Sequence, residues 1–212
     1  MNPGVLFQMR PPLASWSETG ASLRPTDMVP SWSAIVGLVG AAFGWGRSDA
    51  RLVSLADDYA MAVRVDQPGE RIEDYHTVQS PEKVQAERLR ARSRADELAV
   101  EQIHTTITRR EYVSGAAYTF LLLACRDTPV VSTGDIVEAL LRPVFPLYAG
   151  RRSCLLGPIK AEAVVGALDA LLPDATHWDS RLPSTRSATL IRERRDQRIG
   201  AFTYSVRFEC VA

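Results

Sequence analysis

The sequence has few cysteines, and it lacks the spacings that make a metal site or a disulfide framework. Its three cysteines, Cys125, Cys154 and Cys210, lie far apart and form no CxxC pair. No HExxH, GxSxG or P-loop motif is present, and no GxGxxG motif is followed by an acidic residue. We therefore expect no metal and no cofactor, and a reducing cytoplasm is the simplest location.

A long hydrophobic run is also missing. The most apolar segment, "SAIVGLVGAAFGWG" (33–46), is too short and too rich in glycine to span a bilayer. The sequence shows no charged-then-apolar signal at its N-terminus. These absences predict a soluble, cytoplasmic protein with no membrane partner.

Net charge is absent as well, because 25 Lys and Arg residues balance 25 Asp and Glu residues. This balance argues against a polycationic tail and against purely electrostatic capture of nucleic acid. Lysine is almost absent, since Lys83 and Lys160 are the only two. The arginine excess reflects either the base composition of the gene or a need for planar, bidentate donors that also stack on bases, and composition does not separate the two.

The apolar pattern predicts one domain, or a domain with a smaller one appended, built from alternating strands and helices. We expect strands at 4–10, 59–66, 116–125 and 200–211, and helices at 30–46, 48–58, 132–143 and 160–173. This order predicts an α+β, ferredoxin-like sheet with helices on one face. Ser31 or Ser33 is expected to cap the first helix, and Asp57 and Asp58 are expected to lie on the surface.

One charge-rich segment, residues 79–108, is long for a connection inside a compact domain. The flanking "DYHTV" (74–78) and "IHTTITRREYV" (103–113) favour paired strands, with a helical or disordered tip projecting into solvent. The segment carries alternating arginines and ends at Arg109 and Arg110. Such a projection could reach a phosphate chain or stack on unpaired bases, and a solvated helix laced with acids is the equally simple alternative.

Histidines flank the base of this hairpin. His76, next to Tyr75, and His104 could together cleave RNA without metal, by taking the 2′-hydroxyl proton and protonating the leaving oxygen. The alternative is ordinary cross-strand packing. His177 has no partner pattern, and we expect a structural role for it.

The stretch "LYAGRRSCLL" (147–156) places two arginines between apolar runs. Taken alone, it is either a solvated loop or a phosphate clamp.

Five blocks occur in an order that resembles the CasD family, the fifth-family subunits (RAMP superfamily) of type I-E CRISPR Cascade. They are "PLASWSE", "RPTDMVPSWSAIVGLVGAAFG", "DYHTV", "TRREYV" and "YAGRRSCLL", and the resemblance extends from Val5 to about Ile159. It implies a ferredoxin-like (RRM-like) palm formed by 1–73 and 113–212, with a thumb hairpin at 74–112. The Arg/Glu-rich tip, "ERLRARSRADELAVEQ", departs from the family pattern.

The resemblance also implies a function. Members of this subtype are generally not the processing nuclease; they hold the 5′ handle of the CRISPR RNA at one end of a filament of repeated backbone subunits. The large PAM-recognising subunit lies beside them, and target DNA is contacted indirectly.

The implied site contains no catalytic and no metal-binding residue. In "GRRSC" the glycine lets the backbone approach a phosphate, while two guanidiniums and a hydroxyl supply donors, and Cys154 is expected in the core. The expected RNA-binding residues are Arg24, Ser31, Ser33, His76, Arg109, Arg110, Arg151, Arg152 and Ser153. Two alternatives stay open: a metal-independent endoribonuclease that uses Tyr75, His76 or His104, and a scaffold that contacts only protein.

Overall fold

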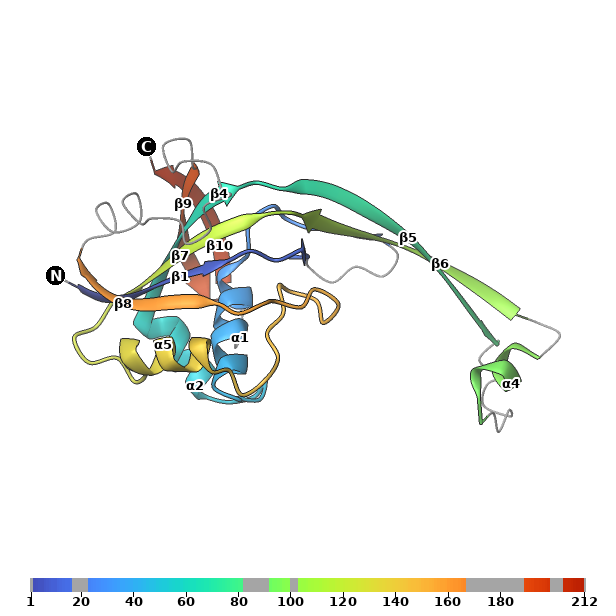
Figure 1. Cartoon of the computed structure of the whole chain (residues 1–212), viewed down its shortest axis with the longest axis horizontal. Helices are drawn as coiled ribbons and strands as arrows, with labels where there is room; N and C mark the ends of the chain where they lie inside the picture. The colour runs from blue at the N-terminus through green and yellow to red at the C-terminus, as the bar shows by residue number, and fades with distance from the viewer. Residues whose placement is uncertain are drawn as a thin grey trace.

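The computed structural model describes residues 2–16, 23–81, 92–99, 103–166, 189–198 and 204–211. It contains two sheets and a layer of helices (Figure 1). The strands are β1 (Asn2–Met9), β2 (Leu13–Ala14), β3 (Leu23–Arg24), β4 (Tyr59–Gln67), β5 (Glu70–Pro81), β6 (Ile103–Ser114), β7 (Ala117–Ala124), β8 (Lys160–Gly166), β9 (Thr189–Arg198) and β10 (Tyr204–Val211). The helices are α1 (Trp32–Ala42), α2 (Arg51–Asp58), α4 (Arg94–Leu98) and α5 (Thr133–Leu141).

The main sheet has six strands in the order β10-β9-β4-β7-β1-β8, and all its neighbours are antiparallel. Its centre is β7, whose apolar side chains are almost all buried. This burial explains why β7 reads as a continuous apolar run in the sequence, since both of its faces are covered. The observed class is a mixed α/β fold whose main sheet is antiparallel.

Three helices, α1, α2 and α5, cover one face of the main sheet (Figure 1). Between them and the sheet lies the principal core, where the rings of Phe7 and Phe120 stack at 4.8 Å and Trp32 is buried. Ser31 caps α1, because its hydroxyl accepts a hydrogen bond from the Ala34 amide at 3.3 Å. Of the two serines expected as the cap, the structure therefore selects Ser31. No helix within the described ranges is both long enough and apolar enough to cross a membrane.

The opposite face of the main sheet buries an ionic cluster. Arg64 donates to Asp66 at 2.6 Å and to the Thr119 hydroxyl at 3.2 Å, and that hydroxyl donates to Asp66 at 2.6 Å. Leu6 and Leu121 are buried on the same face. The cluster joins β4 to β7 through side chains as well as through the backbone.

A second sheet forms around a long hairpin, β5–β6, which projects from the main sheet (Figure 1). Its two strands pair over their full length of 12 residues each. Short β2 and β3 pair with the other edge of β6. Near the outer end lies α4, which begins with a capping box between Ser93 and Asp96 and buries none of its residues.

The helix predicted over 160–173 is wrong for its first half, because Lys160–Gly166 form strand β8. This segment pairs with β1 along its whole length, from Lys160 opposite Gln8 to Gly166 opposite Asn2. The open edge of β1 offers a row of backbone hydrogen bonds, which overrides the helical spacing of a short apolar segment. Residues 167–173 lie outside the described ranges.

The surface position predicted for Asp58 is also wrong. Its side chain is only 2% exposed and accepts a hydrogen bond from the Val130 amide at 2.8 Å, while Arg126 approaches the other oxygen at 3.2 Å. The carboxylate at the end of α2 thereby holds the loop that follows β7. Asp57, in contrast, is exposed as expected.

Candidate nucleic-acid interface

The arginine-bearing stretch forms a tight, docked turn. Tyr148 and Leu155 form an isolated bridge, and the Ala149 amide donates to the Cys154 carbonyl at 2.8 Å. Gly150 has a φ of 87°, and a Cβ at this position would lie 1.8 Å from the Ser15 carbonyl oxygen. Only glycine therefore fits where the turn meets the segment after β2. Cys154 is buried as expected, and burial raises the pKa of its thiol.

The turn orients its three polar residues differently. The guanidinium of Arg151 lies 5.2 Å from the centroid of the Tyr112 ring and donates to the Arg24 carbonyl at 3.3 Å. Arg152 and Ser153 are exposed. One guanidinium is therefore held against the protein, while the next two side chains are open to a ligand.

The strand register brings further arginines to the same place. In the parallel pair β3–β6, Arg24 lies beside Arg110, two residues before Tyr112 on β6. Because side chains alternate along a strand, Arg24, Arg110 and Tyr112 share one face of the second sheet. We call Arg24, Arg110, Tyr112 and Arg151 the arginine face. Asp74, the cross-strand partner of Arg110, adds one carboxylate to this face.

The side chain of Arg110 carries an unsatisfied hydrogen-bond donor. Its Nε is buried and has no hydrogen-bond partner in the described part of the chain. A buried guanidinium donor without an acceptor is costly, so an incoming anionic oxygen would be stabilising there.

Polar contacts hold the loop after β3 against the hairpin. We call this set of contacts the strap, and its residues are Trp16, Thr26, Arg71 and Glu111. Glu111 accepts a hydrogen bond from the Thr26 amide at 3.1 Å, and Arg71 lies 3.6 Å from the same carboxylate oxygen. Arg71 also donates to the Thr26 carbonyl at 3.1 Å, and the Trp16 amide donates to the Thr26 hydroxyl at 2.8 Å. The strap fixes the segment that carries Arg24.

Sequence reasoning missed Tyr112, Thr26 and Glu111. A signal existed for Tyr112, because in "TRREYV" it follows Arg110 by two residues and so shares its strand face. Thr26 and Glu111 gave no signal, because their contact joins residues that are 85 positions apart.

The other expected RNA-binding residues do not gather on the arginine face. Arg109 points to the opposite face of the hairpin, where its Nε lies 3.9 Å from Glu73. His76 lies on the same strand face as Arg110 but farther out, opposite Thr108. Ser31 uses its hydroxyl in the cap of α1 and contacts the Ser33 hydroxyl at 3.0 Å.

The residues of the ribonuclease alternative are not brought together. His76 lies opposite Thr108 and His104 opposite Ser80, which places the two histidines four residues apart along the hairpin, or about 13 Å of strand. Tyr75 points to the other face. A general acid and base must both lie within hydrogen-bonding reach of one substrate group, so this arrangement does not form such a pair. His177 lies outside the described residues.

Known proteins are similar to this chain in sequence. The family model for the CRISPR-associated protein Cas5 matches residues 4–207. The CRISPR system Cascade subunit CasD of Escherichia coli (strain K12) is 31% identical over 167 residues, covering 74% of this chain and 68% of that protein.

Solved structures are similar to this chain as well. A chain of a CRISPR RNA-guided surveillance complex superposes with a TM-score of 0.69 at 26% identity, covering 98% of this chain and 87% of that one. A crystal structure of a Cas protein, at 22% identity and a TM-score of 0.56, shares the fold over 98% of this chain and 94% of its own. The chain therefore belongs to the CRISPR-associated Cas5 family, the family of the Cascade subunit CasD.

Proposed function

We propose that this protein is a non-catalytic RNA-binding subunit of a type I-E Cascade complex, which grips the 5′ handle of the CRISPR RNA and caps the filament of backbone subunits. The observation that carries the proposal is the convergence of Arg24, Arg110 and Arg151 beside Tyr112, next to the exposed Arg152 and Ser153. The guanidinium of Arg151 is held by ring and backbone contacts, so it is preorganised for phosphate oxygens, which lowers the entropic cost of binding.

The proposed architecture is a ferredoxin-like palm (1–73 and 113–212) with a thumb (74–112). Its support is the strand order β4-β7-β1-β8, in which α1 and α2 connect β1 to β4, and α5 connects β7 to β8. This is a βαββαβ arrangement with helices on one face. Strands β9 and β10 extend the sheet beyond β4.

The proposed partners follow from the relatives. CasD of E. coli is named a Cascade subunit, and the solved relative belongs to an RNA-guided surveillance complex. By analogy, this chain would contact the CRISPR RNA, the repeated backbone subunit and the large PAM-recognising subunit in the cytoplasm, and target DNA indirectly. The thumb is the element with the reach to contact a neighbouring subunit.

The test is the double variant Arg151→Ala with Arg152→Ala, assayed in the complex assembled with CRISPR RNA. We expect the protein to stay folded, with a small decrease in melting temperature because Arg151 loses its contacts with Tyr112 and the Arg24 carbonyl. We also expect weaker RNA retention and a log-log salt slope reduced by about 0.7 for each lost phosphate contact to single-stranded RNA. Arg10→Ala with Arg47→Ala removes the same charge from exposed positions outside the arginine face and is the matched control. An unchanged slope would return Arg151 and Arg152 to the solvated-loop interpretation.

The non-catalytic part has its own test. Incubating the purified protein with repeat RNA in EDTA should leave the RNA intact. Specific cleavage that His76→Ala abolishes would establish the ribonuclease alternative instead.

A further inference from the structure

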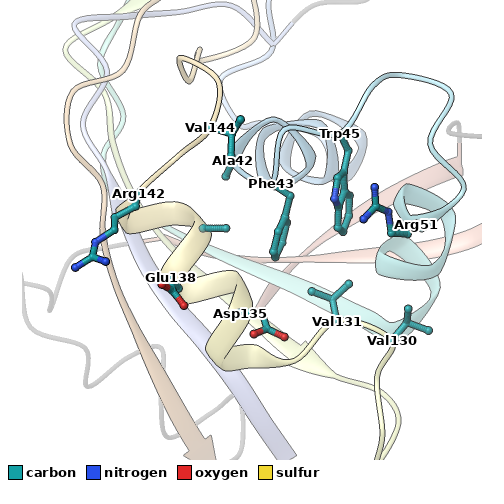
Figure 2. A pocket seen from close by; sticks show the side chains of 11 residues that line it. Ala42, Phe43, Trp45, Arg51, Val130, Val131, Asp135, Glu138, Arg142 and Val144 are labelled. Atoms are coloured by element: carbon teal, nitrogen blue, oxygen red, sulfur yellow. The ribbon is translucent and has the colours of Figure 1, made fainter.

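A cavity of about 450 Å³ lies between the end of α1 and α5 (Figure 2). This volume is within the range of sites that hold a small ligand or a partner's side chain. None of its lining residues belongs to the arginine face. Its rim is apolar, because Val130 and Val144 are each 66% exposed. Exposed apolar residues around a concave site are typical of a protein contact.

One wall of the cavity is aromatic. The rings of Phe43 and Trp45 stack with centroids 4.5 Å apart and planes 11° apart. On the far side of Trp45, the Arg51 guanidinium lies 4.6 Å from the ring centroid (Figure 2). Asp49 holds that guanidinium with two hydrogen bonds, at 2.9 and 2.6 Å, so its charge is neutralised locally. The ring pair thus already accepts a guanidinium on one side.

The opposite wall is acidic. Asp135 and Glu138 lie one turn apart on the same side of α5, and both line the cavity. Asp135 accepts a hydrogen bond from the Ser132 hydroxyl at 2.7 Å. Within the described ranges, no basic side chain forms an ion pair with either carboxylate. The guanidinium of Arg142 points away from the cavity (Figure 2).

We propose that this cavity binds an arginine side chain from a protein partner, with the guanidinium between the Phe43 ring and the carboxylates of Asp135 and Glu138. Apolar residues on the two sides of that arginine would pack on Val130 and on Val144, which lie at opposite ends of the cavity (Figure 2). The two carboxylates would repel the phosphates of RNA, which disfavours a nucleic acid here. A planar guanidinium matches both walls better than an ammonium, because it stacks on a ring and also binds carboxylates through a fork of donors.

The first test uses blocked tripeptides and the isolated protein. N-acetyl-Val-Arg-Val-amide should perturb the Trp45 indole resonance and bind at least tenfold more tightly than the Val-Gln-Val peptide, with Val-Lys-Val between them. Asp135→Asn with Glu138→Gln should weaken the arginine peptide at least tenfold. The matched control, Asp57→Asn with Asp127→Asn, removes two exposed acids elsewhere and should change nothing. Equal binding of the glutamine peptide, no binding at all, or an unaffected acid variant would each overturn the proposal.

The second test uses the assembled ribonucleoprotein, with a photo-cross-linking amino acid in place of Val144. We expect a cross-link to a protein segment that carries an arginine within about three residues, and we expect Asp135→Asn with Glu138→Gln to reduce its yield severalfold. A cross-link to RNA, a cross-link to a segment without arginine, or no cross-link would refute the proposal.

Discussion

At the scale of single residues, Gly150 fixes the position of the arginine turn. We predict that Gly150→Ala destabilises the protein by at least about 2 kcal/mol, because the new Cβ would meet a backbone carbonyl at a positive φ. Urea denaturation would measure this loss. RNA retention should fall with it, because Arg151 and Arg152 would be displaced.

Gly157→Ala is the matched control for this prediction. Gly157 lies just beyond the same turn, and a Cβ there would meet no atom within 4 Å. We expect a change within about 0.5 kcal/mol. Equal effects of the two substitutions would show that the docking of Gly150 on Ser15 does not matter.

Tyr59 gives a prediction about pH. Burial, followed by the charges of Asp58 and Asp135, raises the pKa of Tyr59 to about 12, and its hydroxyl donates to the Val131 carbonyl at 2.7 Å. The folded state therefore keeps the phenol proton to a higher pH than the unfolded chain does. The resulting stability is complete below about pH 10 and is lost between about pH 10 and 12.

Tyr59→Phe isolates this effect from other titrating groups. We expect the free energy of unfolding of the wild type to fall relative to the variant by up to about 1.4 kcal/mol per pH unit above pH 10. Urea denaturation at about pH 8, 10 and 11 measures the difference. A constant difference across this range would mean that Tyr59 titrates normally.

Local chemistry could be predicted from sequence at this scale, whereas distant pairing could not. The cap by Ser31 and the burial of Cys154 follow from short-range pattern. The contact of Arg151 with Arg24 joins residues 127 positions apart, and no local pattern encodes it. The burial of Asp58 cannot be predicted for the same reason, because the Val130 amide that its carboxylate binds lies 72 positions later.

At the scale of elements, the outer end of the hairpin should be dispensable for folding. We predict that replacing 83–102 with a short Gly/Ser turn changes the free energy of unfolding by less than about 1 kcal/mol, because α4 buries no residue. Thermal melting measures this. Assembly with CRISPR RNA should be lost, because the thumb would no longer reach the guide and the adjacent subunit.

Two other results would each be informative for this truncation. If the shortened protein unfolds, the segment supports the core and the palm and thumb boundaries need revision. If assembly is unaffected, the hairpin does not act as a thumb, although the family membership stands.

Secondary structure could be predicted where a segment's own pattern agrees with its surroundings. The apolar run at β7 predicts a central strand, and the hairpin flanks predict paired strands, because each pattern matches the burial that the fold provides. For β8 the spacing of apolar residues favours a helix, but pairing with β1 decides the outcome. The short strands β2 and β3 escaped prediction because two residues carry no period.

At the scale of the whole molecule, the buried cluster of Arg64, Asp66 and Thr119 joins the two central strands. We predict that Arg64→Ala costs about 3–5 kcal/mol, because it leaves the carboxylate of Asp66, 2% exposed, without the guanidinium that lies 2.6 Å from it. The triple variant Arg64→Met, Asp66→Leu and Thr119→Val should be clearly more stable than the single one. Chemical denaturation compares them, and a triple variant as unstable as Arg64→Ala would contradict this account.

The hairpin also has a mechanical consequence. Its strands β5 and β6 continue directly from β4 and into β7, through Gly69 and Gly115, whose φ angles are 73° and 70°. A force applied at the outer end of the hairpin is therefore transmitted through these two glycine connections to the paired strands β4 and β7. Tension along the hairpin β5–β6 reaches β4 and β7 at the same time. The backbone hydrogen bonds between β4 and β9 and between β7 and β1 resist this tension. They are loaded in shear, so they must break together and not one after another.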